Sequence, residues 1–376
     1  MYIDRMEEQR RRRRQIRNWV ILLVLIMLVL LGIRFIGNMG GTTEMGANRL
    51  TCFASQSVTP FGNNILYYDD ASIHCLSSDG GIRWSFPVGS GASFTASDDY
   101  LVIWQGSQVY IVNQSGNATY NDNMSSEVQF ARVGQQYVAV VTGSDTSPHL
   151  VVLDMKGSQV DEEREAFEDM LLLDVGFYGD QGQYMWTLAM DVYGTAINST
   201  LNTFQVGKMS TGEVSVGEKL AYKVLSENNK LRVFTTQQLY TYNYKAVQDT
   251  NSTILVYGWK LIDYDVPDRG DAKLLLAPTS QTSNSQQISD LRLLTGTDDR
   301  RFALPDVCVG AMVRGSSVYG FSGSYMYRSD VTTQKFYAYA LPIGDGETVT
   351  AYLGTLKNGR VLLACDETVY AVTLPE

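Results

Sequence analysis

The feature that most constrains this chain is a strand–turn–strand unit that recurs from Thr51 onward. In Asn64–Val88 one strand pattern (NILYYDD) precedes a second that closes on a Ser-Asp-Gly-Gly turn (SIHCLSSDGG) and a third (IRWSFPV). The same order returns three times, with turn signals at Asp79-Gly80, Ser115-Gly116, Lys156-Gly157 and Thr211-Gly212. Their spacings are 36, 41 and 55 residues. These values bracket the period of a β-propeller blade, which is roughly 40–50 residues.

Four weaker copies follow, and the last ends at Glu376 after its third strand (RVLLACDE, then TVYAVTLPE). We expect the segment around Arg49–Ala54 to supply the missing outer strand, because a ring closed by both termini leaves no open edge. About 325 residues over eight units give roughly 41 per unit. We therefore predict an all-β protein, a β-propeller of four-stranded blades. Eight blades are favoured, and seven stay open if one weak repeat is an insertion. A pair of β-sandwiches explains neither the period nor the recurring Gly turns.

An apolar segment near the N-terminus predicts a membrane anchor. Trp19–Ile33 (WVILLVLIMLVLLGI) holds no charged residue, and Phe35 and Ile36 extend it past Arg34. Eighteen helical residues reach about 27 Å, close to the thickness of a hydrocarbon core. A cleaved signal peptide has a shorter apolar region and a small-residue cleavage site. We therefore predict an uncleaved signal anchor at 19–36, after a single Arg-rich tail at 1–18.

Basic residues before the anchor predict its orientation. They are followed by Trp19, which suits the near membrane interface; the orienting residues are Arg10, Arg11, Arg12, Arg13, Arg14, Arg17 and Trp19. The positive-inside rule places the N-terminus in the cytoplasm and the C-terminal body outside. A Gly-rich tether at 37–48 then leads to the propeller at 49–376. The predicted localisation is a single-pass protein of the cell membrane with an extracytoplasmic body.

The charge of the body indicates which classes of partner it can bind. The whole chain carries −10, and because residues 1–18 contribute +4, the rest carries −14. Nucleic acid is not an expected partner, because phosphate binding needs a basic face. The stretch Asp161–Asp174 (DEEREAFEDMLLLD) is strongly acidic. It is either a solvated outer strand or loop, or a contact surface for a basic partner formed by Asp161, Glu162, Glu163, Glu165, Glu168 and Asp169.

Motifs for catalysis and for cofactors are not found. The two histidines, His74 and His149, have no third metal ligand nearby, and neither a G-x-S-x-G elbow nor a phosphate-binding loop occurs. Asp263, Asp265, Asp268 and Asp271 lie in IDYDVPDRGDAK, which fails the calcium-loop pattern, so we expect a turn between blades. We predict no catalytic residue, no metal and no cofactor.

Four cysteines, Cys52, Cys75, Cys308 and Cys365, show no C-x-x-C spacing. Outside the cell they could form one or two bridges, whose connectivity the sequence does not give. We favour the simpler interpretation that each is a small buried residue in a strand. The five Trp residues, Trp19, Trp84, Trp104, Trp186 and Trp259, are expected in the core or the membrane.

The repeats resemble those of quinoprotein-like propellers, including the outer-membrane assembly lipoprotein type. That repeat has a strand ending in Asp-x-x-Gly and then a Trp, and Ile73–Trp84 with Asp79, Gly80, Gly81 and Trp84 is the best match. The layout of the whole chain is similar to an uncharacterised family of single-span, propeller-bearing membrane proteins of Gram-positive bacteria. Neither resemblance implies a catalytic motif. Quinone enzymes bring adjacent cysteines or calcium ligands, which this chain lacks.

These observations favour a non-enzymatic scaffold that binds an envelope protein outside the membrane, since propeller rims present several loops on a rigid frame. The alternative is a propeller that binds or cleaves glycans of the cell wall. Exposed aromatic residues and two carboxylates in the central channel would favour that alternative. A third possibility is a sensor that passes a signal to the cytoplasm. Because the Arg-rich tail is too short to form a domain, such a signal would have to pass through a partner helix in the membrane.

Overall fold

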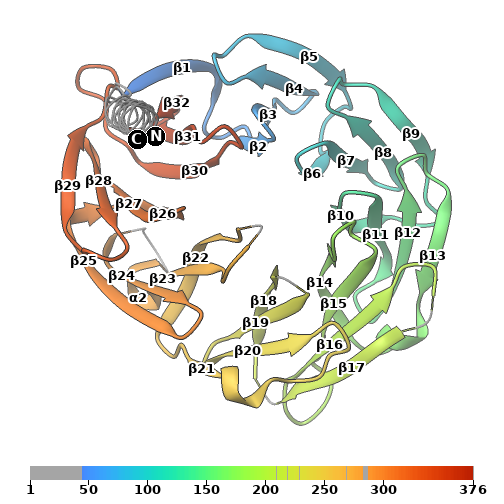
Figure 1. Ribbon diagram of the computed structural model, residues 1–376. Helices are drawn as coiled ribbons and strands as arrows, with labels where there is room; N and C mark the ends of the chain where they lie inside the picture. The colour runs from blue at the N-terminus through green and yellow to red at the C-terminus, as the bar shows by residue number, and fades with distance from the viewer. Residues whose placement is uncertain are drawn as a thin grey trace, which may run out of the picture. The chain divides into compact units, whose positions relative to one another are not determined.

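The computed structural model describes residues 45–208, 210–217, 219–227, 229–267, 269–282 and 287–375. These residues form eight four-stranded antiparallel sheets, the blades of a β-propeller (Figure 1). The predicted fold is confirmed, and eight is the right number of blades. The predicted tail and membrane span, with Arg10–Arg14, Arg17 and Trp19, lie outside the described residues. No helix within the described ranges has the length and hydropathy needed to cross a membrane.

The first four blades follow one another along the chain, and in each the first strand is innermost (Figure 1). Blade 1 consists of β2 (Thr59–Phe61), β3 (Asn64–Tyr68), β4 (Ser72–Ser77) and β5 (Ile82–Pro87). Blade 2 consists of β6 (Ser93–Ala96), β7 (Tyr100–Gln105), β8 (Gln108–Asn113) and β9 (Ala118–Asn123). Blade 3 has β10 (Val128–Val133), β11 (Tyr137–Ser144), β12 (Ser147–Asp154) and β13 (Gln159–Glu163), followed by the 3-10 helix η1 (Glu165–Phe167). Blade 4 has β14 (Leu171–Tyr178), β15 (Tyr184–Asp191), β16 (Asn198–Gln205) and β17 (Ser210–Gly217).

The last four blades repeat this plan. Blade 5 has β18 (Ala221–Glu227), β19 (Lys230–Thr235), β20 (Gln238–Asn243), the 3-10 helix η2 (Thr250–Ser252) and the short β21 (Ile254–Leu255). Blade 6 has β22 (Trp259–Asp265), β23 (Lys273–Pro278), the helix α2 (Thr279–Thr282), β24 (Ile288–Thr295) and β25 (Asp298–Cys308). Blade 7 has β26 (Gly310–Arg314), β27 (Ser317–Phe321), β28 (Tyr325–Asp330) and β29 (Phe336–Ala340). Blade 8 has β30 (Ala351–Thr355), β31 (Val361–Cys365) and β32 (Thr368–Thr373), with β1 (Gly46–Phe53) as its outer strand.

Blade 8 is therefore built from both ends of the described chain, as predicted. β1 pairs antiparallel with β32, from Gly46 opposite Thr373 to Phe53 opposite Thr368. β1 begins at Gly46, so the last residues of the predicted tether already belong to the sheet. Arg360 adds a side-chain link between the last and first blades, donating to Asp79 Oδ1 at 2.6 Å and to the Ser78 carbonyl at 2.8 Å.

The hydrophobic core lies between the blades. Each pair of neighbouring blades encloses one cluster of buried residues, such as Leu66 and Ile73 of blade 1 with Leu101 and Ile103 of blade 2. Further clusters follow around the ring to the one that joins blade 8 to blade 1. Because both faces of each sheet are buried, the middle strands read as continuous apolar runs and not as alternating ones.

The recurring turn between the third and fourth strands has a common cause. Its first side chain accepts hydrogen bonds from backbone N–H groups two and four residues on, at Asn113, Asp154 and Asn243. This is an Asx turn. In blade 1 the equivalent residue is Ser77, whose Oγ accepts from Gly81 N at 3.1 Å. Asp79, the Asp of the repeat pattern, lies two residues later and accepts a hydrogen bond from Arg360.

The outer strand of one blade packs on this turn in the next blade. The Trp84 ring covers Gly116, where a Cβ would lie 2.7 Å from Trp84 Cγ, and Trp84 Nε1 donates to the Gln114 carbonyl at 2.9 Å. Tyr120 covers Gly157 in the same way. The prediction that Gly212 is the fourth turn glycine is wrong. It lies within β17, where the Lys245 backbone leaves no room for a Cβ, and Gly207 makes the turn with φ 74°.

Candidate functional site

The strand order gives the propeller two distinct faces. Because neighbouring strands are antiparallel, the second-to-third strand turns and the blade-to-blade connections share one face, here called the upper face. The first-to-second and third-to-fourth strand turns share the other, the lower face. The first strands of the blades line the central channel between the two faces (Figure 1).

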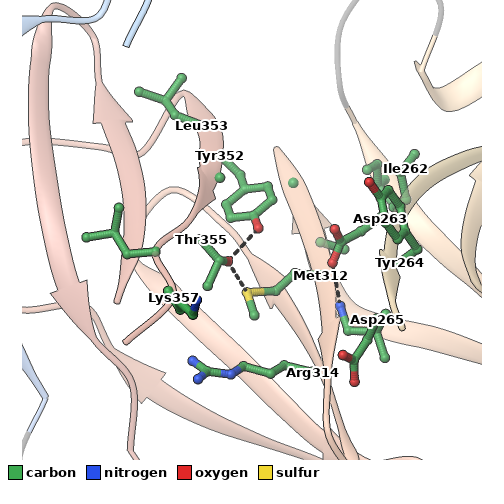
Figure 2. A pocket seen from close by; sticks show the side chains of 16 residues that line it. Ile262, Asp263, Tyr264, Asp265, Met312, Arg314, Tyr352, Leu353, Thr355 and Lys357 are labelled. Atoms are coloured by element: carbon green, nitrogen blue, oxygen red, sulfur yellow. Dashed lines mark hydrogen bonds between the residues drawn. The ribbon is translucent and has the colours of Figure 1, made fainter. Parts of the chain in front are cut away.

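A cavity of about 560 Å³ opens between the inner strands of blades 6, 7 and 8. Figure 2 shows its charged lining, with Asp263 and Asp265 on β22, Arg314 at the end of β26, and Lys357 just after β30. This cavity was not predicted as a site. The expected turn between blades is wrong for Asp263 and Asp265, which lie within an inner strand. Asp268 lies outside the described residues.

The two carboxylates tie blade 6 to blade 7. Asp263 Oδ2 accepts from Val313 N and Asp265 Oδ2 accepts from Gly315 N, both at 2.8 Å. Side chains two apart on a strand point to the same side, so the pair matches two alternate N–H groups of the next blade. Burial, aided by the charge of Asp265, raises the pKa of Asp263 to about 6.

Two tyrosines complete the cavity (Figure 2). Tyr352 shares a 2.7 Å hydrogen bond with Thr355 Oγ1, and Tyr264 is 46% exposed. Carboxylates, cations and tyrosines together suit a ligand with several hydroxyl groups. Within the described residues, no three or more His, Cys, Asp and Glu residues are grouped so that they could hold a metal ion.

A second hollow, of about 670 Å³, lies at the lower mouth of the channel. It is lined by first-to-second strand turns, including Asp98, Asp99, Asp180 and Lys357. Lys357 Nζ lies 3.1 Å from Asp98 Oδ2, and the Lys357 backbone N–H donates to the Gly62 carbonyl at 2.8 Å. Because the inner strand of blade 1, β2, has only 3 residues, Lys357 of blade 8 can contact Asp98 of blade 2.

The predicted acidic surface lies on the outer side of blade 3. Asp161, Glu162 and Glu163 are on the outer strand β13, Glu165 is on η1, and Glu168 and Asp169 follow it. The structure thus brings the six residues together on an outer strand and loop. Some also have structural roles, since Asp161 accepts from Gly207 N and Glu163 from Ala166 N. The rest of the acidic stretch is different, because Asp174 lies on the inner strand β14 and pairs with Arg132 at 2.8 Å.

Both histidines are held by hydrogen bonds within their blades. His149 is buried, and its ring lies between Glu162 and Arg164, at 3.2 and 3.0 Å. His74 contacts Ser85 Oγ through Nδ1 at 2.7 Å and Asp69 Oδ2 through Nε2 at 2.8 Å. The hydrogen bond from His74 is the main reason why the pKa of Asp69 is lowered. These contacts join β4, β5 and the turn before β4, and the prediction of no histidine catalysis stays a prediction.

The four cysteines are free thiols buried in the blades, which confirms the favoured interpretation. Burial raises their pKa values, to about 11 for Cys52 and Cys365 and to about 12 for Cys75 and Cys308. Of the Trp residues, Trp186 is in the core as expected, whereas Trp259 is only partly buried and also lines a surface hollow.

Large apolar side chains are exposed on the upper face of blades 4 and 5 and in the connections that follow them. They come from the β15–β16 turn, from the connection before β18, and from β21 with the connection that follows it. The exposed fractions run from 41% to 73%, and we call the set the upper-face patch: Val192, Tyr193, Ile197, Leu220, Leu255 and Tyr257. Sequence reasoning missed it, because the residues come from separate turns and connections and share no motif.

The patch borders a hollow of about 620 Å³ between blades 5 and 6. Its walls include Tyr222, Tyr257 and Trp259, with Thr236, Lys260 and Thr279 at the sides. An apolar patch of this kind on a protein surface is typical of sites that bind other molecules. Aromatic residues are also enriched in the centres of protein interfaces.

Comparison with solved structures supports the fold. Sqt1 from Saccharomyces cerevisiae matches with a TM-score of 0.56 and 12% identity, covering 88% of this chain and 100% of that one. BamB from Moraxella catarrhalis matches with a TM-score of 0.50 and 10% identity, covering 88% and 96%. Apo AztD from Citrobacter koseri matches with a TM-score of 0.50 and 12% identity, covering 76% and 86%.

At these identities the similarity shows the propeller fold alone, and the resemblance in the repeats is confirmed at that level. No protein-family model matches the chain, and the curated proteins give no significant match. The predicted family of single-span membrane proteins is not tested by these matches.

Proposed function

We propose that this chain is a non-enzymatic scaffold, a membrane-anchored propeller that binds a protein of the cell envelope outside the membrane. The observation that carries the proposal is the upper-face patch, whose six large apolar side chains are 41–73% exposed on blades 4 and 5 and the connections that follow them. Removing such side chains from water is the main driving force for protein association. Anchoring and orientation are supported by the apolar segment at 19–36 and the preceding arginines.

Crosslinking in the native membrane tests the proposal. The tagged full chain is compared with a variant carrying Val192→Ser, Tyr193→Ser and Ile197→Ser, all in one exposed turn. We expect one dominant partner that crosslinks at least about tenfold less to the variant, as truncated interface anchors do. The control is Ile82→Ser on blade 1, at an apolar side chain outside the patch that is 63% exposed. An equal loss in the control, or no partner at all, contradicts the proposal.

The acidic residues of blade 3 form a second contact surface in this proposal, for a basic partner. Glu162, Glu165, Glu168 and Asp169 are all exposed, so their charges are available to a partner in solution. A variant with Glu165→Gln and Glu168→Gln should keep the patch-dependent partner. It should lose any contact that weakens with added salt.

A glycan ligand is the second candidate, and the channel cavity favours it. Asp263, Asp265, Tyr264 and Tyr352 provide the two carboxylates and the aromatic residues that this candidate requires. Because one oxygen of each carboxylate already accepts a backbone N–H, binding is a better fit than cleavage. A glycan array probed with the full chain should then show binding that Tyr264→Ala weakens. Equal binding by Tyr264→Ala would place any glycan contact elsewhere.

A further inference from the structure

The hollow between blades 5 and 6 has an aromatic wall. Tyr222 near the start of β18, Tyr257 in the blade-to-blade connection and Trp259 at the start of β22 enclose its apolar wall. Tyr257 is 73% exposed, the most exposed of the large apolar side chains in the upper-face patch. An aromatic-walled hollow on a rigid frame is a common receptor for a peptide side chain.

The Trp259 wall is fixed before any ligand binds. The guanidinium groups of Arg292 and Arg301 lie 5.9 and 5.5 Å from the centre of the Trp259 ring, within cation–π range. Arg292 is itself held by Asp299, at 2.9 and 2.7 Å, and donates to the Leu255 carbonyl at 2.8 Å. A preformed wall lowers the entropic cost of binding.

Unpaired cations flank this wall. Lys260 lines the aromatic hollow and Arg301 lines a neighbouring one of about 480 Å³, on the other side of Trp259. Both are exposed, and neither has an ion-pair partner among the residues that the structure describes. The nearest carboxylate in the lining, Asp290, accepts hydrogen bonds from Gln281 and Ser289 instead. With Lys260 and Arg301 against Asp290, the two linings carry a net charge of +1 (+2 − 1), in a chain of net charge −10.

We propose that the hollow receives an apolar or aromatic side chain from an acidic peptide segment of the partner, whose carboxylates pair with Lys260 and Arg301. The proposal rests on the proposed function and names the chemistry of the partner at that surface. Charge complementarity selects this occupant, because a basic segment would be repelled by both cations. An aliphatic or aromatic anchor fits the wall, since Lys260 is its one charged lining residue within the described part of the chain.

Selection from a random linear peptide library displayed on phage tests the proposal, with the purified full chain as target. We expect enriched peptides to carry an apolar or aromatic residue flanked by Asp or Glu. Their affinity should fall at least about tenfold for Tyr257→Ser, as for a lost interface anchor. Ile82→Ser on blade 1 is the matched control and should bind as the parent chain does. Both changes are at exposed side chains, so the fold is retained in each.

A charge-reversed target gives a second readout. With Lys260→Glu, which keeps Arg301 against Trp259, selection should turn from acidic peptides to peptides that carry Lys or Arg beside the same anchor. Enriched peptides that bind equally well to Tyr257→Ser, or that are basic on the parent chain, overturn the inference, and so does a selection without enrichment. If the crosslinked partner depends on the β15–β16 turn while these peptides fail, the scaffold stands and only the partner chemistry is wrong.

Discussion

Asp263 shows how a single residue of an inner strand makes the stability of the propeller depend on pH. Its carboxylate is buried beside Asp265, and the pKa rises from the ordinary 3.8 to about 6. A carboxyl group with a raised pKa in the folded state binds protons more tightly there than in the unfolded chain. Its contribution to stability is therefore lost as the pH rises from about 4 to about 6.

We expect Asp263→Asn to raise the free energy of unfolding at pH 7 by about 1–2 kcal/mol, because the buried charge is removed while an amide oxygen can still accept from Val313 N. Urea unfolding at pH 4 and pH 7 measures the effect, which should shrink at pH 4, where the carboxyl group of the folded chain is already protonated. Asp345→Asn, in an exposed loop, is the control and should change little at either pH. A variant that is less stable than the parent at pH 7 contradicts the assignment.

Ser85, His74 and Asp69 form the only hydrogen-bonded Ser–His–Asp series that the described hydrogen bonds contain, and they allow a test of the no-enzyme prediction. Ser85 lies exposed on an outer strand, and serine catalysis needs a shaped site that fixes the acyl oxygen and excludes water. We expect a fluorophosphonate probe to leave Ser85 unmodified, as read by mass spectrometry of the intact chain. An adduct at Ser85 that disappears in His74→Gln would falsify that prediction.

At the scale of single residues, the sequence predicts which residue types occupy the turns but not which residues contact one another. The turn glycines at 80, 116 and 157 were predictable, because each needs a positive φ. Asp263 was missed, because nothing local distinguishes a carboxylate in a turn from one whose partner is the backbone of the next blade, fifty residues away.

At the scale of strands, β1 is the element on which closure of the ring depends. Its Leu50 is buried in the cluster that joins blade 8 to blade 1, whereas Phe53 in the same strand is 55% exposed. We expect Leu50→Ala to lower the free energy of unfolding by about 2–5 kcal/mol. Phe53→Ala should change it by less than about 0.5 kcal/mol. Chemical unfolding of the full chain measures both.

Equal losses for the two variants would mean that β1 is not packed as described. Hydrogen exchange adds a local readout, because the β32 amides that pair with β1 should lose protection in Leu50→Ala before those of β31 do.

The strands themselves were largely predictable, since apolar runs between turn signals mark the second and third strands of most blades. The outer strand of blade 8 was predictable from the missing strand at the C-terminus. The innermost strands were harder. In blade 6, β22 carries Asp263, Tyr264 and Asp265 toward the channel and the next blade, so its polar pattern reads as a loop.

At the scale of the whole molecule, the predicted orientation can be tested with thiol chemistry. The four native cysteines are buried, and burial raises their pKa values to about 11–12, so they should not react while the chain is folded. Glu165→Cys places one reactive thiol on the exposed side of blade 3. We expect a membrane-impermeant maleimide to label it in intact cells.

The parent chain is the control. It should not be labelled while it is folded, and it should be labelled at all four thiols after denaturation. If Glu165→Cys reacts only after the cells are lysed, the body is inside and the proposed localisation is wrong.

The number and order of the blades were predictable from the sequence, because the repeat period is a property of the whole chain. The upper-face patch was not, since it depends on which connections the ring brings to one face.

Blade 8 also sets the order in which the molecule can mature. Gly46 leaves the ribosome long before its partner Thr373 is made. The first strand must therefore wait, unpaired, while seven blades assemble beside it. Pairing residues so distant along the chain is entropically slow. We expect this waiting strand to dock once β32 has been made, and a chaperone that shields exposed strand edges to act on the chain until then.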